Sequence, residues 1–452
     1  MKAINPATGK LIKEYQEHTP DEVRRIIDEV ESEYQRWRNS SFAERAALMK
    51  RAAELLRANK ENYARTISLE MGKVITEARA EIEKCAWACD YYAENAERFL
   101  ADEMIATDGS KSLVAYQPLG IVLAVMPWNF PFWQVFRFAA PALMAGNAGI
   151  LKHASNVPGC ALAIEEVFRQ AGFPRNIFRT LLISSRQVEP VIVNAKVKAV
   201  TLTGSEPAGM QVASVAGRAL KKTVLELGGS DPFIVLEDAD LPACIKTAVT
   251  ARMINAGQSC IAAKRFIVVQ TVKSQFEAEH ARLMQSLKIG DPLDESSQVG
   301  ALARIDLLEE LDKQVQKSIK LGARLLCGGH KAARDGAFYL PTVLTDVKKG
   351  MPIYEQETFG PVSAIIPVKD ADEAIAVAND SAFGLGGALW SNDLQKAEAL
   401  ARKIESGAVF INGMTKSDPR LPFGGIKRSG YGRELSHHGI REFVNVKSIW
   451  IR

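Results

Sequence analysis

The sequence predicts an α/β protein that contains two parallel β-sheets covered by helices. Two stretches, residues 120–228 and 231–404, each alternate short apolar runs with helical patterns, which is the order of βαβ units. The chain has 452 residues, too many for one ordinary hydrophobic core and suited to two or three domains. Hydrophobic residues make up 47% and charged residues 24% of the chain, as in globular proteins.

The N-terminal part is expected to form a short strand-like arm over residues 1–18 and helices over residues 19–99. Thr19 precedes Pro20-Asp21-Glu22, which is typical of a helix start with Thr19 as the cap. These helices are expected to pack on one face of the larger α/β unit.

Two further segments have strand character. Asp108-Gly109 is a strong turn signal between β-prone flanks, so residues 105–120 are expected to form a hairpin. Residues 443–451 are also strand-like. An apolar strand at the end of the chain needs a partner, either within the chain or in another subunit.

The first alternating stretch predicts a ligand site at one edge of its sheet. Strands are expected over 121–126, 148–152, 200–203 and 223–227, with helices over 132–145, 159–171 and 208–219. Ligands bind beyond the carboxyl ends of parallel strands, and these ends carry Pro127-Trp128-Asn129, residues 152–155 and Thr203-Gly204-Ser205. No G-x-G-x-x-G follows a strand. The nearest substitute is 204–209, whose N–H groups at a helix start could hold a phosphate.

The second stretch has the same organisation. Strands are expected over 231–236 and 265–269, with helices over 241–255, 272–287, 306–321, 371–378 and 394–404. Residues 418–433 are rich in glycine, proline and cations and are expected to form a long loop, which in a compact domain is often functional.

Composition excludes several classes of partner. The formal net charge is +4, and no basic run is long enough to suggest a nucleic-acid partner. No apolar stretch is long enough to span a membrane, and the start lacks the apolar core of a signal peptide, so a cytoplasmic protein is expected. The six cysteines are scattered and are expected to be reduced thiols. Cys85 and Cys89 share a helix face and are expected to be packed rather than to bind a metal.

Cys260 is the candidate nucleophile. It follows Asn255-Ala256-Gly257-Gln258-Ser259, whereas a structural cysteine normally lies among apolar neighbours. Glu226 lies in an apolar run, where loss of water raises the pKa of a carboxyl group toward the range of a general base; the alternative is a buried ion pair. Asn129 could donate to a developing oxyanion; the alternative is a turn-forming asparagine.

The chain resembles the aldehyde dehydrogenase superfamily over essentially its whole length. The matching motifs are Pro127-Trp128-Asn129-Phe130-Pro131, Leu225-Glu226-Leu227-Gly228-Gly229, Gly257-Gln258-Ser259-Cys260, Glu357-Thr358-Phe359-Gly360-Pro361 and residues 422–430. The resemblance implies two Rossmann-like parallel-sheet domains and a bridging β-flap used in a homodimer or homotetramer. The implied division is a cofactor-binding domain of 1–104 and 121–228, a catalytic domain of 229–433, and bridging segments 105–120 and 434–452.

The resemblance also implies roles for single residues. Cys260 attacks the aldehyde, the Asn129 amide and the Cys260 N–H hold the oxyanion, hydride passes to the nicotinamide, and Glu226 activates the water that releases the acid. Matching positions imply that the cofactor is held by Trp128, Lys152, Gly204, Ser205, Glu357 and Phe359.

Ser155 decides the expected cofactor. Family members that prefer NAD often have a glutamate at this position, which repels a 2′-phosphate. Ser155 removes that charge and leaves a hydroxyl beside Lys152, and both groups suit phosphate. We therefore expect NADP to be preferred and NAD to be used less well.

Arg137 decides the expected substrate. It lies eight residues after Asn129, about two helical turns along, and could pair with a carboxylate on a short substrate; the alternative is a structural ion pair. The chain most resembles bacterial-type succinate-semialdehyde dehydrogenases, in which the matched Trp133, Arg137 and Ser417 would form the substrate pocket. Some of these enzymes have a second arginine where this chain has Ile254.

Several functions therefore stay open at this point. The leading one is oxidation of succinate semialdehyde, and the second is broad-specificity aldehyde oxidation. A cofactor-free thiol hydrolase would have no need of Glu357 and Lys152, and a catalytically idle scaffold protein would not need Cys260, Glu226 and Asn129.

Overall fold

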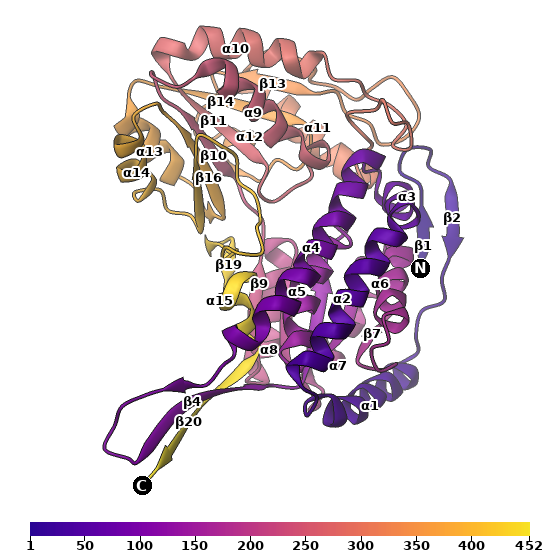
Figure 1. Ribbon diagram of the computed structural model, residues 1–452. Coiled ribbons are helices and arrows are strands. Elements are labelled where there is room, and N and C mark those ends of the chain that lie inside the picture. The colour runs from indigo at the N-terminus through magenta and orange to yellow at the C-terminus, as the bar shows by residue number, and fades with distance from the viewer.

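The computed structural model, which describes residues 1–452, contains two largely parallel sheets and a projecting β-ribbon (Figure 1). The first sheet has the order β19-β9-β8-β5-β6-β7. Its strands are β5 (Ile121–Met126), β6 (Ala148–His153), β7 (Phe178–Thr180), β8 (Val197–Thr203), β9 (Lys222–Glu226) and β19 (Gly430–Tyr431). Strands β5 to β9 are parallel, whereas β19 runs antiparallel to β9.

The second sheet has the order β12-β13-β14-β11-β10-β16-β17. Its strands are β10 (Asp231–Val235), β11 (Ala263–Val269), β12 (Arg324–Cys327), β13 (Thr342–Thr345), β14 (Val362–Val368), β16 (Gly386–Trp390) and β17 (Ala408–Ile411). Only the edge pair β12 and β13 is antiparallel. The predicted α/β fold class with two parallel-sheet regions is confirmed.

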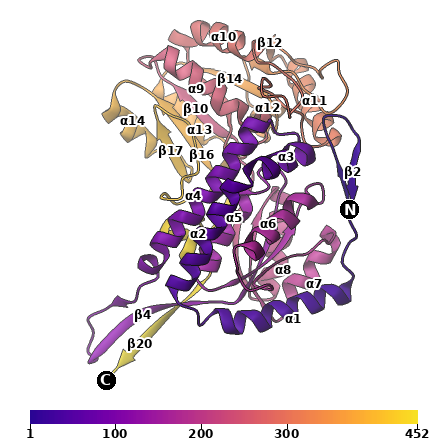
Figure 2. The ribbon, with the colours of Figure 1, turned by 45° about the vertical axis from the view of Figure 1, so that its right-hand side comes forward.

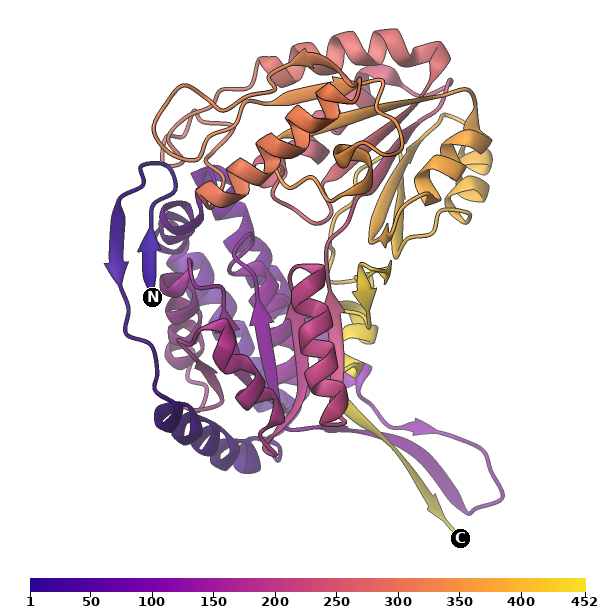
Figure 3. The same cartoon turned by 180° about the vertical axis from the view of Figure 1, so that it is seen from behind.

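Helices cover both sheets. They are α1 (Pro20–Trp37), α2 (Phe42–Ala58), α3 (Lys60–Met71), α4 (Ile75–Phe99), α5 (Trp133–Met144), α6 (Pro158–Gln170), α7 (Val188–Val193), α8 (Glu206–Arg218), α9 (Leu241–Met253), α10 (Gln270–Gln285), α11 (Ile305–Lys320), α12 (Pro352–Glu355), α13 (Ala371–Asn379), α14 (Leu394–Ala401) and α15 (Ser436–Arg441). Helices α4 and α2 lie side by side (Figures 1 and 2), and α4 also packs against α5. Seen from behind, α8 covers the opposite face of the first sheet (Figure 3). No helix is both long and apolar enough to cross a membrane.

The expected cap at Thr19 is present. The Thr19 hydroxyl accepts a hydrogen bond from the Glu22 N–H at 3.3 Å, and the Glu22 carboxylate accepts one from the Thr19 N–H at 2.7 Å. This capping box satisfies backbone N–H groups that a helix start would otherwise leave without partners. The expected N-terminal arm consists of β1 (Lys2–Ile4) and β2 (Leu11–Glu14), which pair antiparallel.

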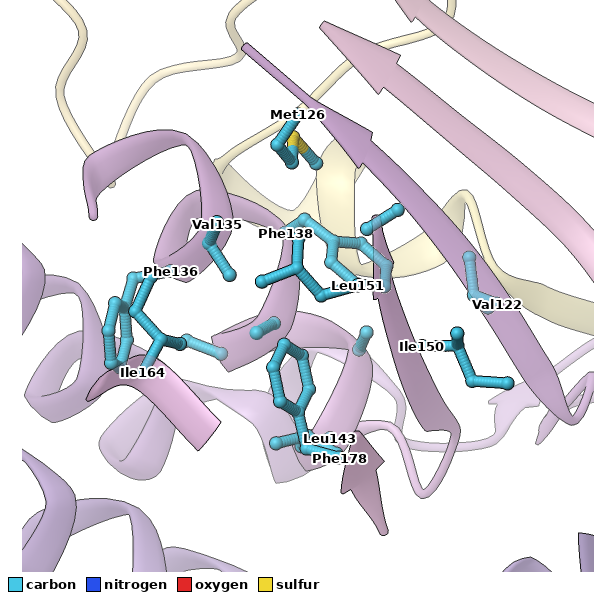
Figure 4. Packing of buried hydrophobic residues seen from close by; sticks show 14 of the residues in the cluster. Val122, Met126, Val135, Phe136, Phe138, Leu143, Ile150, Leu151, Ile164 and Phe178 are labelled. Carbon is cyan, nitrogen blue, oxygen red and sulfur yellow. The ribbon is translucent and has the colours of Figure 1, made fainter. Parts of the chain in front are cut away.

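The core of the first sheet lies between β5, β6 and the helices α5 and α6. Figure 4 shows Leu151 of β6 on the side of α5 and α6, where Phe136 and Ile164 lie, whereas Ile150 points away from them; all four side chains are buried. Both central strands are almost wholly buried, which explains why they appear in the sequence as continuous apolar runs rather than as alternating patterns.

The chain ends in a two-stranded ribbon that projects from the body of the molecule (Figures 1 and 3). β20 (Val444–Ile451) pairs antiparallel with β4 (Lys111–Pro118) over its full length, and β3 (Glu103–Met104) pairs with β4. Of the two partners that the sequence left open, the strand has the one within the chain. Val446, Trp450 and Ile451 nevertheless remain exposed.

Some sequence-based bounds were wrong. The helix expected over 241–255 ends at Met253, because Asn255 and Ala256 adopt left-handed φ values of 53°. The loop expected over 418–433 contains β19 and β18 (Ile426–Lys427), and β18 pairs with the short β15 (Phe383–Gly384). Strand β7 and helix α7, which are too short for a clear periodicity, were not predicted. Strands β12, β13, β14, β16 and β17 of the second sheet were not predicted either. The three-part domain division stays a prediction, and β19, from within its catalytic segment, joins the first sheet.

Candidate active site

A cavity of about 720 Å³ brings together seven of the residues selected from the sequence. They are Trp128, Asn129, Gly204, Ser205, Cys260, Glu357 and Phe359. They come from the loops after β5 and β8, from the turn after α9 and from the segment between α12 and β14, so elements of both sheets form the walls. The predicted position at the carboxyl ends of β5 and β8 is therefore where the cavity lies.

The turn that carries Cys260 is held in a tight conformation. After the two left-handed residues, Gly257 has φ +77°, and a Cβ there would lie 2.1 Å from the Gly360 carbonyl oxygen. Only glycine fits such a close approach. The buried Arg252 guanidinium donates to the carbonyls of Gly257 (2.6 Å) and Ala263 (3.0 Å), which fixes both sides of the turn.

A network of buried amides joins this turn to Asn129. The Asn129 Nδ2 group donates to the Gln258 carbonyl at 3.0 Å, and its Oδ1 accepts from Gln134 at 3.0 Å. Asn255 Nδ2 donates to the carbonyls of Asn129 (2.7 Å) and Gln258 (3.2 Å). An amide has two N–H hydrogens, so Asn129 keeps one for a ligand in the cavity. Asn255, Gln258 and Gln134 were not predicted as site residues, although Gln258 and Asn255 belong to the segment that leads to Cys260.

Burial dominates the electrostatics of the Cys260 thiol. Loss of water raises the pKa of Cys260 to about 12, while the positive charges of Arg137 and Lys264 act in the opposite direction. Lys264 is itself buried and donates to the carbonyls of Cys260 (2.7 Å) and Ser259 (2.9 Å). At neutral pH the thiol of the free enzyme is therefore mainly protonated. The other five cysteines, Cys85 and Cys89 among them, are fully packed, and no cluster of metal ligands exists.

Glu226 is not part of an ion pair, which was the alternative that the sequence left open. Its side chain is buried, and neither carboxylate oxygen has a hydrogen-bond partner. Burial raises its pKa well above the ordinary range of a carboxyl group, and Arg137 opposes this shift. Glu226 does not line the cavity. A Cβ on Gly229, three residues later, would lie 2.8 Å from the Cys260 carbonyl oxygen, so the chain after Glu226 passes directly beside the Cys260 turn.

Glu357 and Phe359 line the cavity from the segment between α12 and β14. Glu357 accepts a hydrogen bond from the Gly229 N–H at 2.9 Å and lies 3.5 Å from the Lys264 ammonium. The Phe359 ring meets the Trp128 ring edge to face, with centroids 5.7 Å apart. Together they give the cavity one aromatic and one acidic surface.

One end of the cavity suits a phosphate. Ser205 is the cap residue of α8, but its side chain makes no capping hydrogen bond, so its hydroxyl and the first N–H groups of α8 remain available. Lys152 and Ser155 do not line the cavity. Lys152 is buried near the end of β6, forms no ion pair, and has its pKa lowered by burial, whereas Ser155 is exposed in the following turn.

The three residues expected to bind substrate are not on the cavity wall either. Arg137 and Glu434 form an ion pair in which the side chains are 2% and 4% exposed. Arg137 also donates to the Thr203 hydroxyl at 3.2 Å and covers the Phe423 ring. This pair is the structural alternative that the sequence left open, and Glu434 was not foreseen.

Lys84, which was not predicted as a site residue, contacts both Trp133 and Ser417. Lys84 on α4 donates to the Ser417 hydroxyl at 2.6 Å, and its ammonium lies 4.3 Å from the centre of the Trp133 ring. No sequence signal could have identified Lys84, because it is one of several charged residues on an amphipathic helix.

This fold and site define an α/β enzyme with a half-buried cysteine on the wall of a cavity large enough for a nucleotide. The chain belongs to the aldehyde dehydrogenase family, whose model matches residues 1–449.

Similar proteins are known over the full length of the chain. It is 54% identical over 448 residues to a probable succinate-semialdehyde dehydrogenase [NADP(+)] of Synechocystis sp., covering 99% of each chain. It is 51% identical over 451 residues to succinate-semialdehyde dehydrogenase [NADP(+)] 1 of Mycobacterium tuberculosis, again covering 99% of each. The crystal structure of succinic semialdehyde dehydrogenase from Streptococcus pyogenes in complex with NADP⁺ matches with a TM-score of 0.98 and 40% identity, covering 100% of this chain and 99% of that one.

Proposed function

We propose that the protein oxidises succinate semialdehyde to succinate with reduction of NADP, and that it uses NAD less well. The observation that carries this proposal is the 54% identity, over 99% of both chains, to a relative named as a probable succinate-semialdehyde dehydrogenase [NADP(+)]. Ser155, the residue that distinguishes the cofactor in the sequence, is consistent with it.

The site fits a dinucleotide in several respects. Ser205 at the start of α8 has a free hydroxyl, and Gly204 leaves the backbone open to a pyrophosphate. Glu357 would hold the nicotinamide ribose, and Trp128 and Phe359 would flank the ring. Lys152, a buried cation without an ion pair, would bind the ribose end of the adenosine with Ser155, where a phosphate compensates its charge. A bound nicotinamide would supply the hydride acceptor for the oxidation of the carbon attached to Cys260.

The chain's own residues supply the remaining chemistry. Glu226, whose pKa burial raises, is matched to accept a proton near neutral pH from the water that attacks the thioester. The Cys260 thiolate attacks the aldehyde carbon to form a thiohemiacetal. The free N–H of the Asn129 amide and the Cys260 N–H stabilise its oxyanion. After oxidation, the water activated by Glu226 hydrolyses the thioester and releases the acid.

A substrate and cofactor panel tests this proposal. Steady-state rates are measured at the absorbance band of reduced nicotinamide with succinate semialdehyde, glutarate semialdehyde and butanal, each with NADP and NAD. We expect the highest kcat/KM with succinate semialdehyde and NADP. A higher kcat/KM for NAD would overturn the cofactor, and no reduction of either nicotinamide would indicate a thiol hydrolase.

Broad-specificity aldehyde oxidation is the second candidate function. Ile254 replaces the second arginine of some related enzymes, and Arg137 is committed to Glu434, so two expected contacts to a substrate carboxylate are absent or weakened. Similar kcat/KM values for butanal and succinate semialdehyde would favour it.

Assembly and location are part of the same proposal. We infer a homodimer or homotetramer, because β20 exposes Val446, Trp450 and Ile451 on a ribbon that projects from the body. An exposed apolar strand favours association. A cytoplasmic location is expected from the reduced thiols. Light scattering after size exclusion would measure the mass, and a monomer would contradict the inference.

A further inference from the structure

Lys84 lies between the two side chains expected to line the substrate site. Its ammonium donates to the Ser417 hydroxyl oxygen at 2.6 Å and lies 4.3 Å from the centre of the Trp133 ring. Because Ser417 accepts this hydrogen bond, its own hydroxyl hydrogen is free to donate. Trp133 and Ser417 are 4% and 6% exposed, and Lys84 is partly buried. Gln134, the neighbour of Trp133, lines the cavity together with Cys260.

Every carboxylate near Lys84 is bound to another cation. Glu81, one turn earlier on α4, forms an ion pair with Lys73. Asp418 is held by Arg420 at 2.6 Å, and Glu434 pairs with Arg137. Lys84 therefore has a hydroxyl and an aromatic face but no counter-ion.

An ammonium removed from water without a counter-ion is unfavourable. Burial lowers the pKa of Lys84 to about 8, and the neighbouring positive charge of Arg137 contributes in the same direction. A carboxylate placed here would remove this cost, because it would pair with Lys84 and also accept from Ser417. Arg137, on the same face of α5 as Trp133, adds a second positive charge nearby.

The position of Lys84 is fixed relative to Trp133. The Glu81 carboxylate accepts hydrogen bonds from the N–H groups of Phe132 (2.8 Å) and Trp133 (3.0 Å) at the start of α5. A carboxylate at a helix N-terminus is favourable, and this one locks α4 against α5. The lysine, the indole and the serine therefore form a preorganised group rather than a chance surface contact.

We propose that Lys84 is a specificity-determining residue that binds the carboxylate at the far end of the substrate, in a subsite completed by Ser417 and Trp133. The subsite takes a short aldehyde with a terminal carboxylate. It supplies the cationic contact that Ile254 does not provide and that the Arg137–Glu434 pair weakens. This inference rests on the proposed function, because it requires an acidic aldehyde as substrate.

The test compares succinate semialdehyde with butanal, which has the same four carbons and no carboxylate. Wild type, Lys84→Met, Lys84→Arg and the control Lys60→Met are assayed for kcat/KM with both aldehydes. Lys60 is a cation on the neighbouring α3 that already has the partner Glu83 at 2.7 Å. We expect Lys84→Met to lower kcat/KM for succinate semialdehyde about 10-fold to 100-fold, as for loss of a charged hydrogen bond. We expect it to leave butanal unchanged, Lys84→Arg to recover part of the loss, and Lys60→Met to resemble wild type.

The pH dependence gives a second readout. Lys84 carries its charge below its pKa of about 8, so the ratio of kcat/KM for succinate semialdehyde to that for butanal should fall above about pH 8, since kcat/KM reports the free enzyme. Dividing by butanal cancels the titration of Cys260 and Glu226. Of the other groups around Lys84, Arg137 and Glu81 are ion-paired. Arg420 lowers the pKa of Asp418, and burial raises that of Cys85 well above its ordinary value. In Lys84→Arg the ratio should stay flat to higher pH.

The outcomes separate this inference from the function on which it rests. If wild type does not prefer succinate semialdehyde to butanal, the proposed function fails. If wild type shows the preference and Lys84→Met retains it, or loses activity equally toward both aldehydes, the Lys84 subsite is refuted. A ratio that is independent of pH in wild type would also refute it.

Discussion

Removing Arg137 alone should destabilise the protein far more than removing Arg137 and Glu434 together. The two side chains are 2% and 4% exposed, so loss of one leaves the other charged and buried without compensation. Breaking a buried pair in this way costs about 3–5 kcal/mol, whereas replacing both partners by apolar residues is about neutral or stabilising. Arg137→Met and Glu434→Leu should therefore each lose about 3–5 kcal/mol, and the double variant should recover most of that loss.

Equilibrium unfolding in urea, followed by circular dichroism, measures these differences. The double-mutant cycle separates the pair from the cavity that each shortened side chain leaves. Asp418→Ala, which removes the partner of the largely exposed Arg420, serves as a control with an expected loss below about 1 kcal/mol. If Arg137→Met unfolds at the wild-type urea concentration but raises KM for succinate semialdehyde alone, Arg137 serves the substrate and the structural role is wrong.

Three further predictions concern the cofactor and the chemistry. Ser155→Glu should raise KM for NADP about tenfold to thirtyfold, because an exposed carboxylate about 4 Å from a 2′-phosphate costs about 1.5–2 kcal/mol in water. KM for NAD should not rise. Equal changes in KM for both cofactors would contradict the assignment of Ser155 to the 2′-phosphate. Glu226→Gln should lower steady-state kcat about 10²–10⁴-fold. Stopped flow should still detect a burst of reduced nicotinamide equal to the enzyme concentration. Absence of the burst would mean that Glu226 is needed before the thioester forms. Because burial raises the pKa of Cys260 to about 12, and the thiolate is the reactive form, alkylation of the free enzyme by iodoacetamide should accelerate about tenfold per pH unit between about pH 6 and about pH 9. A plateau below pH 8 would show a much more acidic thiol, and the buried positions of the other cysteines make the reaction selective.

Local features of the sequence were enough to predict much of the fold. The alternation of apolar runs and helical patterns indicated both sheets, because strands buried on two faces must be apolar throughout. Thr19 before Pro20 indicated a helix start that its capping box confirms. Cys260 among small polar residues indicated a reactive thiol, and the apolar neighbours of Glu226 indicated a buried carboxyl group with a raised pKa. Each of these inferences depends on residues close together in the chain.

Only the tertiary structure decided which distant residues meet. The sequence allowed Arg137 to bind a substrate carboxylate, whereas in the fold its guanidinium forms an ion pair with Glu434. In the sequence Lys84 is one of many charged residues on a helix. In the fold its ammonium donates a hydrogen bond to Ser417, which is 333 residues away in the sequence. The helix before Cys260 ends at Met253, earlier than predicted, because Asn255 donates a hydrogen bond to the Asn129 carbonyl on a distant loop. The physical reason is the same in each case. The partner of a buried charge or amide depends on which elements pack together, and the local periodicity of the sequence contains no information about that packing.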